Sequence, residues 1–187
     1  MSIEKEPRKL NLGCGLDIRQ GWVNVDSVNL PGVDIVCNIE KLPLPFPDEE
    51  FNEILCRDIL EHTEYPPVLK DIHRILKRGG KLSIQVPHFT SKNNFVDPTH
   101  KKLFSVSTFD FFVEGTPIFE KHSYYFDFVY ADILSSHITF ERAPKVFFYN
   151  SLVEWIVNKS PRMQRFYEST GFSRIFPAEN ITVELTK

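Results

Sequence analysis

The sequence predicts an α/β fold built on an open, twisted and mostly parallel sheet. Gly13 and Gly15 follow a short apolar strand at 9–12, so the chain can turn sharply and leave its amides facing a bound group. A second apolar strand ends on Asp26, at the carboxyl edge where open parallel sheets bind their ligands. A strand, a helix and another strand follow in that order within 51–86. Together these observations predict a Rossmann-like sheet with a nucleoside ligand, closed by an antiparallel strand near the carboxyl terminus.

Length, composition and charge limit the classes of protein that remain. A chain of 187 residues that is 42% apolar can fill one domain but is short for two, so residues 1–187 are expected to form a single domain. A net charge of −3 without a basic stripe argues against nucleic acid and anionic membranes as partners. No segment has the length and apolarity of a membrane span or a signal peptide, which predicts a soluble, cytoplasmic protein.

The cysteines indicate a reducing environment. Cys14, Cys37 and Cys56 each lie in or beside a predicted strand, and their number is odd. Buried free thiols are therefore expected rather than disulfides. Their spacing does not fit a metal site.

The first strands, at 9–12, 23–26, 33–37 and 51–56, are joined without full helices. The first two connections are shorter than the dozen or so residues that a parallel crossover normally needs. Three prolines in the third connection, at positions 43, 45 and 47, exclude a regular helix there. One face of this early sheet should therefore lack helices. Either the carboxyl-terminal helices or a second subunit must cover it, and a homodimer is one way to do so.

The fourth connection should hold the one full helical crossover. Asp58 and Glu61 have the spacing of a capping pair at a helix start, which favours structural capping for Asp58. Apolar residues at helical spacing continue to position 76, and Gly79 or Gly80 would supply a left-handed stop before a strand at 81–86. The histidines at 62 and 73 are interpreted as packing or surface residues.

The carboxyl-terminal part should complete the sheet. Segments 124–134 and 138–149 are rich in strand-forming residues and predict a hairpin around 141–144, while 181–186 alternates like a strand. Helices are expected at 151–158 and 161–170. The second has Ser160 as its cap, Pro161 at its first position and Gly171 as its stop. Five apolar residues of these helices are candidates to cover the early sheet: Leu152, Trp155, Ile156, Phe166 and Tyr167.

The order of five motifs from about residue 9 to 88 carries a family resemblance. In chain order they are NLGCG, VNVD, FPDEEFNEIL, LEH and RILKRGGKLSIQVP. This order resembles the class I S-adenosylmethionine-dependent methyltransferases, particularly the small type 11-like group. A weaker likeness, in DPTHKKLFS and TFDFF, extends to about Phe112. The resemblance implies S-adenosylmethionine as cofactor and methyl transfer to a nitrogen or oxygen of a small molecule. It also implies that 88–130 is an aromatic insertion facing the substrate.

The resemblance also implies which residues bind the cofactor. Gly13 and Gly15, with Cys14 between them, would let the backbone approach the methionine part and the ribose. Asp26 would accept both ribose hydroxyls. Asn38 would accept from the adenine amino group, since an amide oxygen can replace a carboxylate there, and the Ile39 amide would face a ring nitrogen.

Three further positions are implied at the methionine end of the cofactor. Asn11 stands where related enzymes usually have an acid that contacts the cofactor's amino group. Cys56 and Arg57 would border the methionine end, with Arg57 facing its carboxylate. Asp17 replaces the third glycine of the fuller motif.

The segment after the strand at 81–86 concentrates groups that can move a proton. His88 follows that strand directly and is the first candidate for a catalytic base, with His100 second and Asp97 third. Asp97 is equally explained as a helix cap with Pro98 at the first helical position. Imidazole and carboxylate groups of His88, Asp97, His100 and His122 are metal-ligand types, but their irregular spacing argues against a metal site. No metal is therefore expected.

Two other classes of function stay open at the level of the sequence. One is a non-catalytic cofactor-binding or partner-binding module on the same fold, which the amides at Asn11 and Asn38 permit. The other is a nicotinamide-dependent oxidoreductase, which would need a third glycine where Asp17 stands. Nothing in the sequence names the methyl acceptor.

Overall fold

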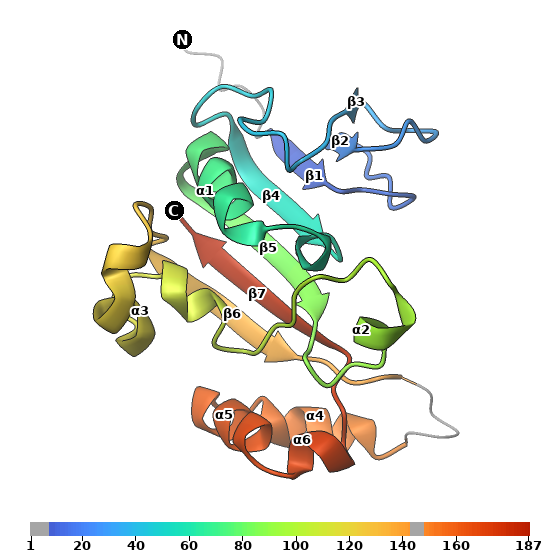
Figure 1. Cartoon of the computed structure of the whole chain (residues 1–187), viewed down its shortest axis with the longest axis vertical. Coiled ribbons are helices and arrows are strands. Elements are labelled where there is room, and N and C mark those ends of the chain that lie inside the picture. Colours follow the sequence, from blue (N-terminus) through green and yellow to red (C-terminus); the bar gives the residue numbers. More distant parts are fainter. Residues whose placement is uncertain (1–7, 143–147) are drawn as a thin grey trace.

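Seven strands form one sheet in the order β3-β2-β1-β4-β5-β7-β6 (Figure 1). The computed structural model describes residues 8–142 and 148–187. Strands β1 to β5 are parallel, and β7 runs antiparallel to its neighbours β5 and β6. This arrangement confirms the predicted Rossmann-like, mostly parallel sheet. The strands are β1 Lys9–Leu12, β2 Val23–Asp26, β3 Ile35–Val36, β4 Phe51–Arg57, β5 Leu76–Pro87, β6 Asp132–Ile138 and β7 Asn180–Thr186.

The helices are unevenly distributed along the chain. As predicted, the described chain has no helix between β1 and β4. One full helix joins β4 to β5, and three helices lie between β6 and β7 (Figure 1). The α-helices are α1 Tyr65–Ile75, α2 Asn93–Val96, α3 Pro117–His122, α4 Asn150–Val157, α5 Pro161–Ser169 and α6 Phe172–Ile175, and short 3₁₀ helices span Leu60–His62, Phe109–Phe112 and Ser123–Tyr125. Within the described ranges, no helix is long and apolar enough to cross a membrane.

The crossover helix starts later and ends earlier than predicted. It begins at Tyr65 after Glu64, with prolines in its first turn, where a missing N–H does no harm. Asp58 does not cap it and instead has a φ of 51°, so the capping prediction was wrong. The helix ends at Ile75 and the chain passes straight into β5. Gly79 has a φ of 70° but lies inside β5, so it is not the helix stop.

The predicted hairpin of 124–134 and 138–149 does not form. One strand, β6, occupies 132–138, and it pairs with β7, which comes after three helices in the chain. Residues 143–147, within the predicted turn and second strand, lie outside the described residues. Local strand propensity thus identified a strand here but not its partner, because β6 pairs with a segment distant in the sequence.

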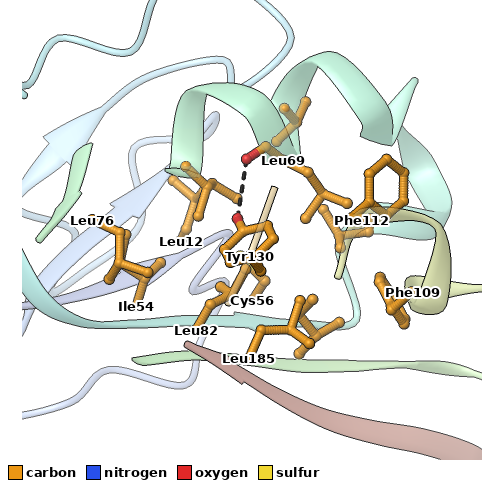
Figure 2. Close-up of a cluster of buried hydrophobic side chains, with 14 of the residues drawn as sticks. Leu12, Ile54, Cys56, Leu69, Leu76, Leu82, Phe109, Phe112, Tyr130 and Leu185 are labelled. Carbon is orange, nitrogen blue, oxygen red and sulfur yellow. Dashed lines mark hydrogen bonds between the residues drawn. The ribbon is translucent and has the colours of Figure 1, made fainter. Parts of the chain in front are cut away.

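The main core lies between the sheet and α1. Alternate residues of the strands, among them Leu12, Ile54 and Leu82, point toward this helix (Figure 2). Tyr130 is fully buried, and its hydroxyl donates to the Leu69 carbonyl of α1 at 3.1 Å (Figure 2). The buried aromatics of 104–130 belong to this core rather than to a pocket: Phe104, Phe109, Phe112, Phe128 and Tyr130.

The opposite face of the sheet is charged. Lys9 of β1 pairs with Glu53 of β4 at 2.9 Å, and Glu53 lies 3.7 Å from Lys81 of β5. Lys81 in turn pairs with Glu184 of β7 at 3.0 Å. These side chains are partly exposed and alternate with core residues, which is the pattern of a sheet with one solvated face. The expectation of an apolar face that needs a cover was therefore wrong, and this face gives no support to a homodimer.

The carboxyl-terminal helices pack elsewhere. Helices α4, α5 and α6 lie together at the end of β6, on the far side of the sheet from β1 to β3 (Figure 1). Val157 and Tyr167 pack there in a second core with Ile138 and Phe140. The prediction that these helices cover the early sheet was wrong, and Trp155 is 61% exposed.

The boundaries of α5 follow its sequence signals in part. The Ser160 side chain accepts from the Met163 amide, which confirms the predicted cap. Gly171 follows the helix but has a φ of −61°, so it is not a left-handed stop.

Candidate functional site

A cleft of about 520 Å³ opens at the carboxyl edge of the sheet. Its walls come from the segments that follow β1, β2, β3 and β4, the edge where parallel sheets bind ligands. Four of the predicted cofactor residues meet here. The lining residues are Gly13, Asp26, Ser27, Asn38, Ile39, Glu40, Ile59, His62 and Thr63. We call this the first cleft.

The glycine turn is shaped by Asp26 and by Ile59. Gly13 has a φ of 70°, and a Cβ there would lie 2.5 Å from the Ile59 side chain. Gly15 has a φ of 50° and open space around it. The Asp26 carboxylate accepts the Gly15 amide at 2.8 Å through one oxygen and the Val28 amide at 3.0 Å through the other. The Ser27 hydroxyl lies 3.5 Å from the oxygen that accepts from Val28. A carboxylate has about four acceptor positions, so Oδ2 keeps one for a ligand hydroxyl, and Oδ1 keeps one when Ser27 turns away.

Asn38 forms a turn at the rim of the first cleft. Its side-chain oxygen accepts the Glu40 amide at 2.9 Å. This is the usual way in which asparagine closes a local turn. The turn leaves the exposed Asn38 and the buried Ile39 side by side at the cleft. The amide oxygen predicted to accept from adenine is therefore already engaged once by the backbone.

Other predicted cofactor residues point away from the first cleft. Asn11 is buried and donates to the Asp17 carbonyl at 2.7 Å and to Asn24 at 3.1 Å, so it holds the loop between β1 and β2. Arg57 is exposed and lies 3.5 Å from Asp17. Cys56 is fully buried in the core, where burial raises the pKa of its thiol to about 12 (Figure 2). These three side chains therefore lie outside the first cleft, because alternation along the strands turns them elsewhere.

Cys14 also does not line the first cleft. It is buried between the two glycines, and its amide donates to the Val25 carbonyl at 3.0 Å. All three cysteines are free thiols, as predicted.

A larger cleft of about 840 Å³ adjoins the first one and shares His62 with it. It contains two of the predicted catalytic residues, Asp97 and His100, together with two acids that follow β4. Its lining residues are Asp58, Glu61, His62, Pro87, Asn93, Val96, Asp97, His100, Glu179 and Asn180. We call this the second cleft.

A hydrogen-bond chain orients His62 in the second cleft. The Thr99 hydroxyl donates to Asp97 at 2.6 Å and lies 2.8 Å from His62 Nδ1. A hydroxyl has one proton, so when it goes to Asp97 the His62 Nδ1–H must donate to Thr99. His62 Nε2 is then the nitrogen with a free lone pair. The hydrogen bonds from Thr99 also lower the pKa of Asp97.

Glu61 and His100 lie next to this chain with polar atoms unsatisfied. The His100 ring packs at a right angle to His62, with centroids 4.7 Å apart, and its Nε2 lies 3.9 Å from Glu61 Oε1. Among the described residues, Glu61 Oε2 and His100 Nδ1 are buried without a hydrogen-bond partner. Burial, reinforced by nearby Asp58 and Asp97, raises the pKa of Glu61 to about 8. Burial also lowers the pKa of His100.

His88, the first candidate for the catalytic base, is a structural residue. It is fully buried, its Nδ1 accepts the Thr90 amide at 3.1 Å, and its Nε2 lies 3.1 Å from Glu168. Glu168 also accepts the Val106 amide at 2.7 Å. Both imidazole nitrogens are therefore occupied and neither faces a cleft. The first residue after β5 turns into the second core, away from both clefts, and this placement does not support the predicted role as base.

The potential metal ligands that converge in the structure differ from the set His88, Asp97, His100 and His122 considered from the sequence. His122 packs between aromatic rings of its own segment, 5.4 Å from Phe111 and 5.3 Å from Tyr125. In the described ranges, the group whose ligand atoms converge is Glu61, His62 and His100. Sequence reasoning missed the first two because it assigned them to a helix. Their position just after β4, at the ligand-binding edge, was the available signal.

Comparisons with known proteins show which proteins the chain is similar to. Residues 8–84 match a family model described as a methyltransferase domain. An uncharacterised protein of Methanocaldococcus jannaschii is 38% identical over 145 residues, which is 66% of this chain and 62% of that protein. A second uncharacterised protein of that organism is 31% identical over 80 residues, 42% of this chain and 38% of its own length. The chain thus spans less than two thirds of these relatives.

Solved structures share the fold at low sequence identity. A SAM-dependent methyltransferase from Archaeoglobus fulgidus superposes with a TM-score of 0.62 at 19% identity, covering 97% of this chain and 86% of its own. The YcgJ protein of Bacillus subtilis gives 0.58 at 17%, with 97% and 92% covered. A Haemonchus contortus phosphoethanolamine N-methyltransferase, solved with phosphomonomethylethanolamine and S-adenosylhomocysteine, gives 0.56 at 18%, with 97% and 48% covered. The match over residues 8–84 and the shared fold bear out the resemblance to the class I S-adenosylmethionine-dependent methyltransferases.

Proposed function

We propose that this protein transfers a methyl group from S-adenosylmethionine, bound in the first cleft, to a nitrogen or oxygen of a small molecule in the second cleft. The observation that carries the proposal is that the two clefts adjoin and share His62. A donor and an acceptor bound in them would meet beside this side chain. Holding the two reactants together in line can by itself supply several kcal/mol of the barrier.

The residues of the first cleft fit such a cofactor. Asp26 Oδ2 keeps a free acceptor position, and Oδ1 gains one when the Ser27 hydroxyl, 3.5 Å away, turns to the ligand, which suits the two adjacent hydroxyls of a ribose. Gly15 leaves open space above its backbone, and Ile39 offers an apolar surface to a base. When bound, S-adenosylmethionine supplies an electrophilic methyl group on a sulfonium centre.

The residues of the second cleft suit an acceptor that donates hydrogen bonds. Four acidic residues line the cleft together with His62 and His100: Asp58, Glu61, Asp97 and Glu179. Amino and hydroxyl groups match acceptors of this kind. His62 replaces His88 as the candidate for the catalytic base, because its Nε2 is free to accept a proton from the acceptor.

Cofactor binding can be tested with S-adenosylhomocysteine. This ligand should raise the melting temperature, whereas NAD should not. Asp26→Ala should weaken binding of S-adenosylhomocysteine by roughly 1.5–3 kcal/mol, the scale of a lost charged hydrogen bond. Glu120→Ala, an exposed acid on α3, is the matched control and should bind normally. Stabilisation by NAD alone would favour an oxidoreductase and overturn the proposal.

Turnover can be tested with methyl-labelled S-adenosylmethionine. Label should pass to a small molecule of a cell extract, and mass spectrometry would then identify the acceptor. Asp26→Ala should transfer much less label than Glu120→Ala. If S-adenosylhomocysteine binds but no extract yields a labelled product, the protein is a non-catalytic binding module on this fold.

A further inference from the structure

We propose that Glu61, His62 and His100 bind a divalent transition-metal ion in the wall of the second cleft. One ligand atom from each of these side chains lies within 4.8 Å of the other two. Glu61 and His62 come from the 3₁₀ helix that follows β4, and His100 comes from the loop that follows α2. Residues nearly forty positions apart thus supply three donors to one point.

Backbone hydrogen bonds hold the two segments together. The amides of Lys101 and Lys102 both donate to the Glu61 carbonyl, at 2.7 and 3.2 Å. The residue after His100 is therefore tied directly to the residue before His62. The approach of the three side chains is a property of the backbone and does not depend on exposed, freely rotating side chains.

Two atoms of this cluster lack a partner. Glu61 is 1% exposed and the His100 side chain 7% exposed, so water has little access to either. Among the residues that the structure describes, Glu61 Oε2 and His100 Nδ1 accept or donate no hydrogen bond. Buried polar groups in folded proteins are almost always satisfied, so two unsatisfied atoms on neighbouring side chains indicate a missing ion or ligand.

The surroundings of His62 match those of a metal ligand. Its Nδ1 is held by Thr99, whose hydroxyl is held by Asp97. Histidines that bind metals usually donate their second nitrogen to a carboxylate, a carbonyl or an intervening group, which fixes the ring and presents the other nitrogen to the ion. Thr99 and Asp97 perform this orienting role for His62 here.

The charge balance also favours a cation. Asp97 lies 3.8 Å from His100, and Asp58 lines the same cleft as Glu61, which places three acids around the cluster. The nearest cationic side chains face other acids: Arg57 pairs with Asp17, Lys101 with Glu40 and Lys102 with Glu64. Because these cations are engaged elsewhere, a divalent ion would supply the positive charge that the acids of the cluster lack.

The donor set indicates which metals to try. Two imidazoles and one carboxylate suit Zn²⁺, Mn²⁺, Fe²⁺ or Co²⁺, whereas Mg²⁺ and Ca²⁺ prefer oxygen ligands throughout. Three protein ligands leave coordination positions open, and all three residues line the second cleft. With the ion bound, His62 Nε2 would serve as a ligand and not as the base, and a nitrogen or oxygen of the acceptor would fill an open position on the metal. This last consequence rests on the proposed function, whereas metal binding itself does not.

The test is titration of chelator-treated full-length protein with Zn²⁺ and with Mn²⁺ by calorimetry, and with Co²⁺ by absorption spectroscopy. Wild type should bind one equivalent, and the cobalt spectrum should show nitrogen and oxygen coordination. Glu61→Gln, His62→Gln and His100→Gln should each abolish saturable binding. Thr99→Val, which removes only the orienting hydroxyl, should weaken it by about 10–100-fold. His137→Gln, a histidine on β6 that pairs with Glu154, is the matched control and should bind as wild type.

The outcomes separate this inference from the proposed function. Circular dichroism of each metal-free variant shows whether it is folded, and His100→Gln, on a loop, decides the question if Glu61→Gln does not fold. Absence of one-equivalent binding, or binding unchanged in the three ligand variants, overturns the metal site. Loss of S-adenosylhomocysteine binding with metal binding intact overturns the proposed function alone. Metal-free protein that binds S-adenosylhomocysteine normally but no metal overturns this inference alone.

Discussion

The two clefts at the carboxyl edge of the sheet differ in how their polar groups are satisfied. In the first cleft, Asp26 and Asn38 each accept hydrogen bonds from neighbouring backbone amides. In the second cleft, Glu61 and His100 keep buried polar atoms without partners among the described residues. The backbone therefore supplies hydrogen bonds to the polar side chains of the first cleft. In the second cleft, a polar or charged ligand would satisfy the atoms that the described residues leave without partners.

The same contrast separates two histidines that look alike in the sequence. His88 has both ring nitrogens occupied inside the second core. His62 has one nitrogen oriented by Thr99 and the other directed to a cleft. A catalytic or ligand-binding histidine needs a ring nitrogen with a free lone pair that a substrate can reach. Of these two histidines, only His62 has one.

The largest expected effect is loss of stability on removing His88. His88→Ala should lower the free energy of unfolding by about 3 kcal/mol, since it opens a cavity and leaves Glu168 partly unpaired. Urea unfolding measures this effect. His137→Ala, which removes a half-exposed pair with Glu154, should cost less than about 1 kcal/mol. If His88→Ala kept wild-type stability and lost turnover, His88 would return as a catalytic residue.

The second prediction concerns His100, which lines the second cleft but not the first. His100→Gln should lower turnover by about a hundredfold, a typical loss for a group that acts on the acceptor. Affinity for S-adenosylhomocysteine should not change. Single-turnover methyl transfer and calorimetry measure the two quantities. A parallel loss of cofactor affinity would show that the clefts are not separate in function.

The third prediction compares Gly13 and Gly15, the two glycines of the turn after β1. Each has a positive φ, so an alanine at either position should cost about 1–2 kcal/mol of stability. Gly13→Ala should cost more, because its Cβ would also collide with Ile59, whereas Gly15→Ala meets no atom within 4 Å. Thermal unfolding of both variants gives the difference. Equal losses would mean that Ile59 moves aside freely.

The smallest expected effect is in thiol reactivity. Cys56 should not react with a thiol reagent in the folded protein, either at pH 7 or at pH 9, since its pKa of about 12 keeps it protonated and its burial excludes the reagent. Cys37, which is partly exposed beside the first cleft, should react first. Peptide mapping after brief labelling identifies the modified residue. Labelling of Cys56 that S-adenosylhomocysteine prevents would restore it to the cofactor site.

Sequence alone was enough for the parallel strands and for the part of the site that depends on backbone conformation. The glycine turn and the strand ending at Asp26 are local features, each set by residues within a few positions of one another. Their meeting in one cleft follows from a rule of parallel sheets, whose carboxyl ends share an edge. The helix-poor early connections were equally predictable from their length and their prolines.

Only the tertiary structure decided where side chains point and which distant segments meet. Asn11, Cys56 and Arg57 were placed at the cofactor by position, but alternation along the strands sends one under a loop, one into the core and one to the surface. The charged face of the sheet became clear only when strand register brought Lys9, Glu53 and Lys81 into one row, with Glu184 diagonal to Lys81. The meeting of Glu61 and His62 with His100 depends on a loop that returns to the sheet edge after β5. Such long-range contacts leave no local pattern in a single sequence, because the residues that make them are chosen by the packing of the whole chain.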